Sequence, residues 1–384
     1  MKIHEELWLA PYMTFQPNKE KPIHRWFYYK EGYSPEIVEY CLKKEQSHSR
    51  EIKSLIDPFC GVGTSLLAAK KSGLKSCGID ASELAVLVSK VKCTNYTKED
   101  ISEIIFFLSK KLKREASIKW DFELFSPRAA FPKRNLIEIL SIREAIYEYE
   151  CGQKAKDFLL LALLSILPQA SIVIKDGGVL KIDKRKRAMP AKEAFFRKLK
   201  LMLKDIEENK IDGPEPAVFL GDARHLNFKD EYFDVAITSP PYLNNVDYSK
   251  IYGLELSLLA LDQQSTKKTR GRLLHSFIKG DHFTLNSPPE CGDVGQKIPI
   301  VGSYFADMEL VIKELQRVLG EGRAAYFVVS NAVIFNEHIL VDKILAEIGN
   351  RLGMEAEIII GAYRFADVKP QRVQTRESVV ILRK

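Results

Sequence analysis

The sequence lacks the cysteine patterns of metal-binding and disulfide-linked proteins. Its six cysteines are isolated, and none belongs to a Cys-x-x-Cys pair. A chain of 384 residues can bury a sizeable core without disulfides, so we expect most of these cysteines to be small buried hydrophobic residues. The seven histidines form no ligand-spaced cluster, and the sequence therefore predicts no metal site.

Long apolar runs are also missing. The most apolar stretch, residues 158–167, is shorter than the roughly 18 to 20 residues that span a membrane, and it continues into Pro168. We expect it to be a buried helix. The first residues include Glu5 and Glu6 and lack the basic-then-apolar pattern of a signal peptide. These absences predict a soluble, cytoplasmic protein without a membrane segment.

Two common nucleotide-binding signatures are incomplete in this chain. There is no Gly-Lys-Ser/Thr phosphate loop, which argues against binding of nucleoside triphosphates. Gly61 and Gly63 stand where a dinucleotide fingerprint would begin, but the third glycine of that fingerprint is missing. A dehydrogenase is therefore a poor interpretation of this sequence.

The excess of positive charge is modest for the length of the chain. Lysine and arginine outnumber aspartate and glutamate by 58 to 51, a formal net charge of +7. This permits a polyanionic partner without requiring one. Two segments are locally basic, KIDKRKR at residues 181–187 and KKTRGR at residues 267–272. Taken alone, each is as consistent with a solvated face as with a phosphate-binding surface.

Short apolar stretches alternate with helix-like segments along much of the chain. The candidate strands are residues 53–56, 75–79, 217–220, 233–237, 324–329, 357–360 and 378–382, and a helix is expected at 341–352. This alternation predicts an α/β fold with a mainly parallel, doubly wound sheet and helices on both faces. Ligands of such sheets bind outside the carboxyl ends of the strands, and the unusual residues of this chain cluster there.

Two regions interrupt the alternation. Residues 97–212 are largely helical in pattern, and residues 263–303 are rich in polar residues, glycine and proline and are interpreted as a loop. We therefore divide the chain into segment 1–96, a helical insertion at 97–212, and segment 213–384 with the loop inserted. Insertions on such scaffolds commonly carry substrate recognition, and the sequence does not decide between these two.

The first candidate site follows the first strand. Residues 57–64 read DPFCGVGT, and glycines there let the backbone turn tightly and approach a ligand. Asp80 ends the second strand, where a carboxylate can accept hydrogen bonds from ribose hydroxyls or cap the next helix. Asp222, in GDAR after the third strand, can accept a hydrogen bond from an adenine amino group or serve as a turn residue.

The sequence TSPPY at residues 238–242 is the most informative motif. It follows the apolar strand at 233–237, and its two prolines remove two backbone donors and fix two φ angles. The strand must end there with free carbonyl groups in a rigid arrangement. Such carbonyls can accept hydrogen bonds from a flat, amino-bearing base, and Tyr242 can stack on that base.

In this order, DPFCGVGT, GID, GDAR and TSPPY resemble the motifs of the amino-methyltransferases of nucleic acids. Residues 24–42 resemble the cofactor-flanking segment of that family. LNNVDYSKIYGLELSLL and RESVVILRK resemble the helix after the catalytic loop and the closing strand of many cytosine-N4 DNA methylases. The resemblance covers roughly residues 20–95 and 215–384 and implies a Rossmann-like class I methyltransferase fold. It does not extend to the middle insertion.

The resemblance also implies roles for individual residues. S-adenosylmethionine is the implied cofactor, with Asp57 near its methionine moiety, Asp80 at the ribose and Asp222 at the adenine. The other implied cofactor-binding residues are Phe59, Gly61, Gly63 and Thr64, and the implied catalytic residues are Ser239, Pro240, Pro241 and Tyr242. Serine at the first position of the catalytic tetrapeptide is more typical of cytosine-N4 enzymes, whereas adenine enzymes more often carry Asp or Asn.

We therefore expect a DNA methyltransferase that acts on the amino group of cytosine. The target atom is unreachable inside a duplex, so the base must be flipped out of the stack. In this context, the basic segments are expected to contact phosphates. The residues concerned are Lys181, Lys184, Arg185, Lys186, Arg187, Lys267, Lys268, Arg270 and Arg272.

Three alternatives remain open. An RNA methyltransferase acting on ribosomal cytosine or transfer-RNA guanine would use the same loops, and so would a DNA adenine-N6 enzyme. A non-catalytic subunit would often lose the tetrapeptide or the glycines, and both are intact here. The sequence does not reveal the recognition site, the oligomeric state, or whether a restriction endonuclease accompanies the protein.

Overall fold

The computed structural model describes residues 1–48, 51–110, 117–176, 178–243, 247–261, 267–269, 273–274, 287–368 and 371–384. In this part of the chain, an eight-stranded sheet has the order β1-β11-β12-β8-β7-β2-β3-β6. Its strands are β1 (Lys2–Glu5), β2 (Ser54–Asp57), β3 (Lys75–Asp80), β6 (Ala217–Leu220), β7 (Phe233–Thr238), β8 (Leu319–Ser330), β11 (Glu355–Val368) and β12 (Gln371–Arg383). Only β12 runs antiparallel to its neighbours, which confirms the predicted mainly parallel sheet.

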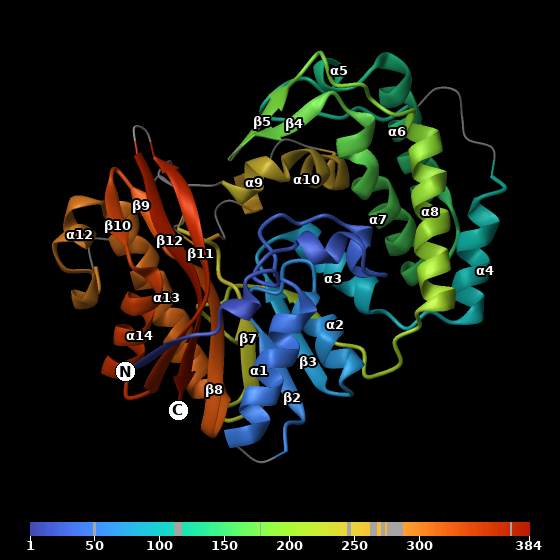
Figure 1. The fold of residues 1–384 in the computed structure, drawn as a ribbon. Helices are drawn as coiled ribbons and strands as arrows, with labels where there is room; N and C mark the ends of the chain where they lie inside the picture. Colours follow the sequence, from blue (N-terminus) through green and yellow to red (C-terminus); the bar gives the residue numbers. More distant parts are fainter. Residues whose placement is uncertain are drawn as a thin grey trace.

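Helices cover both faces of the sheet (Figure 1). One face packs on α1 (Pro35–His48), α2 (Thr64–Lys71) and α3 (Glu83–Cys93), and the other on α13 (Pro299–Val318) and α14 (Val341–Arg351). Alternate residues of β8 enter the two cores, with Tyr326 and Val328 on one side and Ala325 and Phe327 on the other. This period of two is the reason why the central strands read as continuous apolar runs. The doubly wound architecture is as predicted.

The insertion at 97–212 forms a helical lobe beside the sheet (Figure 1). Its helices are α4 (Lys98–Phe107), α5 (Pro127–Ala130), α6 (Lys133–Glu148), α7 (Gln153–Ala170) and α8 (Ala191–Glu208). The apolar stretch at 158–167 lies within α7 and is buried at almost every position, as expected. Among the described residues, no helix is both long and apolar enough to cross a membrane.

The lobe also contains a β-hairpin that was not predicted. It consists of β4 (Val173–Asp176) and β5 (Val179–Ile182) and includes the start of the basic segment KIDKRKR. Four residues per strand are too few for an alternating pattern to be distinguished from a helical one. Smaller elements are β9 (Ala332–Ile334), β10 (Glu337–Ile339), α9 (Tyr248–Ile251), α10 (Gly253–Ala260), and 3-10 helices at Leu7–Leu9, Gln16–Lys19, His24–Trp26 and Pro289–Cys291.

The interpretation of residues 263–303 as a loop is wrong for its last part. Helix α12 (Gly292–Lys297) and the first turns of α13 lie there. The glycines and prolines suggested a loop, but Pro299 occupies the first position of α13, where a missing backbone N–H costs no hydrogen bond. Residues 263–266, 270–272 and 275–286 lie outside the described residues.

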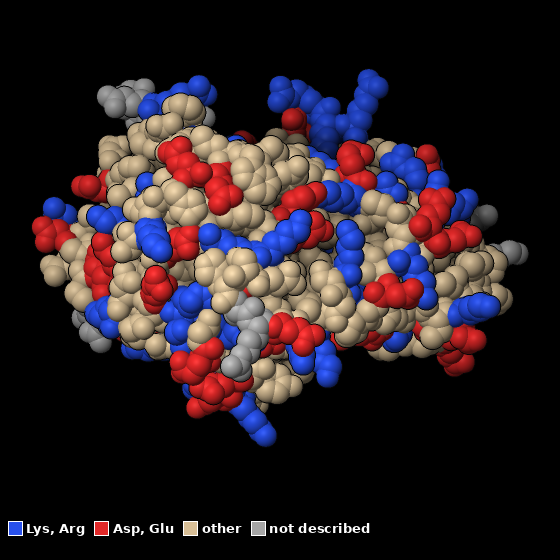
Figure 2. Space-filling view, turned by 60° about the horizontal axis from the view of Figure 1, so that its bottom comes forward, with Lys and Arg blue, Asp and Glu red and all other residues tan. Residues whose placement is uncertain are grey.

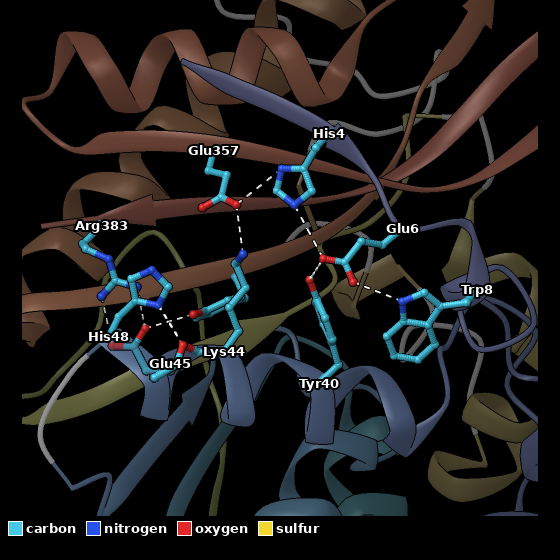
Figure 3. A network of polar contacts seen from close by, with 11 residues as sticks. His4, Glu6, Trp8, Tyr40, Lys44, Glu45, His48, Glu357 and Arg383 are labelled. Atoms are coloured by element: carbon cyan, nitrogen blue, oxygen red, sulfur yellow. Dashed lines mark hydrogen bonds and ion pairs between the residues drawn. The ribbon is translucent and has the colours of Figure 1, made fainter.

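Strand β1 was also missed, because its four residues are all exposed and show no alternation. It pairs with β11, and polar side chains at this edge of the sheet contact α1, as Figure 3 shows. The Tyr40 hydroxyl donates to Glu6 at 2.7 Å, and the Lys44 ammonium lies 2.9 Å from Glu357. Because β1 ends at the carboxyl edge of the sheet and α1 returns from it, residues 6–34 cross that edge. This crossing brings the N-terminal segment to the site.

Candidate active site

The site lies where the direction of the sheet connections changes. From β2 the chain builds outward to β3 and β6, and it then returns to β7 on the other side of β2. The loops after β2 and β7 meet at this switch point, where α/β sheets bind ligands. They border a pocket with about 960 Å³ of empty space, including the part that is open to solvent. The predicted residues that line it are Phe59, Gly61, Asp80, Asp222, Ser239, Pro240, Pro241 and Tyr242.

The glycine loop after β2 is held from two sides. The amide of Cys60 donates to the Ile79 carbonyl at 2.9 Å, and the Ser89 hydroxyl donates to the Gly61 carbonyl at 2.8 Å. Gly61 and Gly63 have φ angles of +49° and +79°, which favour glycine. A Cβ on Gly63 would also lie only 3.1 Å from two atoms of Ser89. Gly61 therefore faces the pocket, whereas Gly63 allows α2 and α3 to pack closely.

Thr64 and Asp57 were predicted to bind the cofactor, but neither lines the pocket. Thr64 begins α2 and is buried. The Asp57 carboxylate is 2% exposed and accepts hydrogen bonds from the Phe59 amide at 3.1 Å and the Thr238 hydroxyl at 2.6 Å. Burial raises the pKa of Asp57 to about 6, against these hydrogen bonds. Asp57 thus joins the glycine loop to the end of β7 from behind the pocket.

Asp80 holds the glycine loop by hydrogen bonds and also lines the pocket. Its two carboxylate oxygens accept hydrogen bonds from the amides of Gly61 and Ser82, each at 2.9 Å. Burial raises the pKa of Asp80 to about 6, although these hydrogen bonds act to lower it. Each carboxylate oxygen can accept a further hydrogen bond, so Asp80 retains the capacity to bind hydroxyl groups in the pocket.

Asp222 is held in place by an ion pair. The Arg224 guanidinium lies 2.7 Å from Asp222 and 2.9 Å from Asp307 of α13. Burial alone would raise the pKa of Asp222, but the hydrogen bonds from Arg224 outweigh it and lower the pKa below its usual value. The pocket therefore contains an ionised, fixed acceptor at neutral pH.

The tetrapeptide after β7 forms the wall opposite the glycine loop. Pro240 is buried, and Ser239 and Tyr242 are partly buried. The Tyr242 amide donates to the Tyr248 hydroxyl at 3.3 Å, which ties the tetrapeptide to α9. Burial raises the pKa of Tyr242 above its usual range, with Glu377 adding to the effect and a hydrogen bond with Ser239 opposing it. The tyrosine is therefore neutral at physiological pH.

An aromatic wall of the pocket was not predicted. Tyr29, from the segment before α1, stacks on Tyr252, with ring centroids 4.7 Å apart. The Tyr252 hydroxyl donates to Glu31 at 2.7 Å. Phe27 and Tyr248 complete the wall. The density of aromatic residues in both segments was a usable signal, but nothing in the sequence indicated that they meet.

None of the described lysines and arginines of the two basic segments lines the pocket, although Thr269 of the second segment does. These basic side chains differ in their partners. Lys181 lies 2.6 Å from Asp176 and Arg185 3.1 Å from Asp183, whereas the Lys186 ammonium donates to the Val173 carbonyl at 2.6 Å. Lys186 thus anchors the hairpin and is poorly placed to bind phosphate. The exposed residues are Lys181, Lys184, Arg185, Arg187, Lys267 and Lys268, while Arg270 and Arg272 lie outside the described residues.

Comparison with known proteins gives similarity over nearly the whole chain. No family model matches. The chain is 28% identical to the Type II methyltransferase M.AvaI of Nostoc sp., over 94% of this chain and 84% of the relative. It is 26% identical to the Type II methyltransferase M.BsoBI of Geobacillus stearothermophilus, over 89% and 81%. It is 24% identical to the Type II methyltransferase M.MvaI of Kocuria varians, over 86% and 82%. This similarity confirms the predicted enzyme class, a methyltransferase that uses S-adenosylmethionine.

Proposed function

We propose that this protein methylates the amino group of cytosine at a specific site in duplex DNA. The observation that carries the proposal is the shared pocket of the glycine loop and the tetrapeptide of residues 239–242. The relatives named Type II methyltransferases support a role in DNA modification within a restriction–modification system. The serine at the first position of the tetrapeptide supports cytosine as the target, by resemblance to cytosine-N4 enzymes.

The pocket suits S-adenosylmethionine. Gly61 leaves room for the ligand beside the backbone, Asp80 accepts hydrogen bonds from the ribose hydroxyls, and Asp222 accepts one from the adenine amino group. Arg224 already fixes the Asp222 carboxylate, so cofactor binding does not have to order this side chain. When bound, the cofactor supplies an electrophilic methyl group on a positively charged sulfur.

The tetrapeptide prepares the acceptor. Conjugation with the ring makes the base amino group a weak nucleophile. Its two hydrogens would donate to the Ser239 hydroxyl and the Pro240 carbonyl, which favours a pyramidal nitrogen with an available lone pair. A bound cofactor would supply the methyl group to this lone pair while Ser239 and Pro240 hold the amino group, and one amino proton would pass to solvent. Alignment is most of the catalytic task, and two successive prolines give the loop the rigidity for it.

Tyr242 stacks on the base in this proposal. Flipping a base costs its stacking in the duplex, and an aromatic face in the pocket restores part of that energy. Tyr242 is tied to α9 through Tyr248 and is already in place before DNA arrives.

The acceptor class is tested by supplying radiolabelled S-adenosylmethionine with duplex DNA, single-stranded DNA or total RNA in parallel. We expect label in duplex DNA, saturating at a fixed number of methyl groups for a given sequence. The Ser239→Ala variant should retain cofactor binding and lose most of the transfer. Label confined to RNA would contradict the proposal and assign the protein to the RNA-modifying branch.

A further inference from the structure

We propose that the free end of the β4–β5 hairpin enters the major groove of the substrate DNA and reads a G·C pair beside the target cytosine. This inference rests on the function proposed above. It assigns target recognition to the helical insertion, and within it to one ribbon that includes the start of the basic segment.

The first observation is the position of the hairpin. Figure 1 shows it projecting from the helical lobe above α9, toward the side of the molecule that carries β11 and β12. The Lys175 ammonium of β4 lies 3.7 Å from the centre of the Tyr252 ring and 3.6 Å from Glu255. Tyr252 stacks in turn on Tyr29 in the pocket wall. A cation–π contact and a ring stack therefore connect the hairpin to the wall of the active site.

The base of the hairpin is firmly held. The Asp183 amide donates to the Ile172 carbonyl at 2.8 Å, and Lys186 donates to the Val173 carbonyl at 2.6 Å. The side chain of Asn135 donates to the carbonyls of Ala170 and Met189, each at 2.8 Å. A two-stranded ribbon anchored at its base and free at its end has a shape that fits the major groove.

The second observation is the chemistry of the free end. The strand register places Asp176 opposite Val179, and Ile174 opposite Lys181, so that these four side chains share one face. Asp176, Val179 and Lys181 are exposed, Val179 by 49%. The exposed valine side chain cannot form hydrogen bonds with water. Together, Asp176, Val179 and Lys181 offer an acceptor, an apolar surface and a donor, which are the groups that contact base edges.

The hydrogen-bonding groups indicate which base pair fits. In the major groove, lysine donates to the O6 and N7 atoms of guanine, and a carboxylate accepts from the amino group of cytosine. Lys181 and Asp176 are within 2.6 Å of each other, close enough to serve the two bases of one pair. An exposed ion pair of this kind contributes little to stability, so its members can exchange one another for base edges at small cost.

The neighbouring basic residues complete the surface. Lys184 and Arg187 follow the hairpin in sequence and are exposed, so their side chains are available for phosphate contacts. The face seen in Figure 2, with the bottom of Figure 1 brought forward, has lysines and arginines interspersed with acids. That face lies away from the carboxyl ends of the parallel strands, and its mixed charge does not favour a polyanion.

The test is methylation of a duplex library with random bases around a cytosine, followed by sequencing that detects the methylated base. The wild type should require a G·C pair at one flanking position. Asp176→Ala and Lys181→Ala should relax that requirement by roughly 10-fold, the discrimination of one good base contact. Lys184→Ala should instead weaken methylation of all sequences evenly.

Lys53→Ala is the matched control. Lys53 is an exposed lysine that pairs with Glu51 at 3.0 Å. It precedes β2, at the amino-terminal ends of the parallel strands, so its loss should leave the preference for the flanking G·C pair unchanged. Unaltered preference in Asp176→Ala and Lys181→Ala, or a wild type with no G·C requirement, would overturn the assignment of the ribbon while DNA methylation stands. No methylated DNA from the wild type would overturn both proposals.

Discussion

At the scale of single residues, a change at Tyr242 tests whether acceptor binding and cofactor binding use separate side chains. Its ring lies in the pocket, but the loop that shapes the cofactor side is held by Asp80, Ser89 and Ile79. Replacing Tyr242 by Ala should therefore weaken DNA binding by about 1–3 kcal/mol, the value of stacking one base. The affinity for S-adenosylhomocysteine, measured by calorimetry, should stay within about twofold, because the hydrogen bonds that hold the glycine loop do not involve Tyr242. Tyr242→Phe keeps the ring and should bind DNA nearly normally. Equal losses of both ligands in Tyr242→Ala would refute this separation of roles.

Asp80 should make cofactor binding depend on pH. Burial raises its pKa to about 6, so the carboxylate is mostly protonated at pH 5 and mostly ionised at pH 7. The ionised form accepts the ribose hydrogen bonds, so affinity should rise with pH by roughly 10-fold over this range. Asp80→Asn cannot ionise and should bind weakly at both values. Calorimetric titration with S-adenosylhomocysteine measures this, and a wild-type affinity independent of pH would rule out the assigned role of Asp80.

At the scale of structural elements, the tight turn before α2 can be tested with a matched pair of glycines. Gly63 and Gly73 have φ angles of +79° and +74°, but only Gly63 would bring a Cβ against a neighbour. Gly73→Ala should cost about 1 kcal/mol from backbone strain alone. Gly63→Ala should cost about 1–3 kcal/mol more, because the crowding at Ser89 adds to that strain. Urea unfolding measures both, and equal costs would show that the packing of α2 on α3 does not depend on Gly63.

The strands differ in how well they could be predicted from the sequence. Strands β2, β3, β6 and β7 were predicted within a residue or two, because each has an apolar run that ends in turn residues. Burial explains that run for β2, β3 and β7 but not for the edge strand β6, which is mostly exposed. Strand β1 and the β4–β5 hairpin were missed, since four residues with several polar or exposed positions show no clear apolar run or period. Residues of all four motif loops line the pocket. The aromatic wall of Tyr29 and Tyr252 was beyond reach, because it forms between residues more than 200 positions apart.

At the scale of the whole molecule, one buried carboxylate fastens the helical lobe to the N-terminal segment. Asp205 of α8 is fully buried and accepts hydrogen bonds from the Ile23 amide at 3.0 Å, the Arg25 side chain at 3.1 Å and the Trp26 indole at 2.9 Å. Phe27 and Tyr29 of the pocket follow directly in sequence. The insertion therefore stabilises the site from outside it. Sequence could not reveal this link, because its partners lie about 180 positions apart.

Removing this carboxylate should be costly. Asp205→Ala leaves the Arg25 guanidinium and two further donors without their partner, and we expect a loss of about 3–5 kcal/mol in the free energy of unfolding. Glu208→Ala, in the same helix, removes an exposed pair with Lys204 and a weaker electrostatic attraction to Arg25, and it should cost less than about 1 kcal/mol. Denaturant unfolding measures both. A small effect of Asp205→Ala would show that the lobe and the N-terminal segment are held together by other contacts.

The central claim, transfer of a methyl group to the cytosine amino nitrogen, is tested most directly by identifying the product. DNA methylated by the purified protein is digested to nucleosides, and the modified nucleoside is identified by mass and chromatography. We predict N4-methylated deoxycytidine, with most of it lost when the Ser239→Ala variant replaces the wild type. Methylation on adenine, or on carbon 5 of cytosine, would contradict the proposed geometry of Ser239 and Pro240 around the amino group.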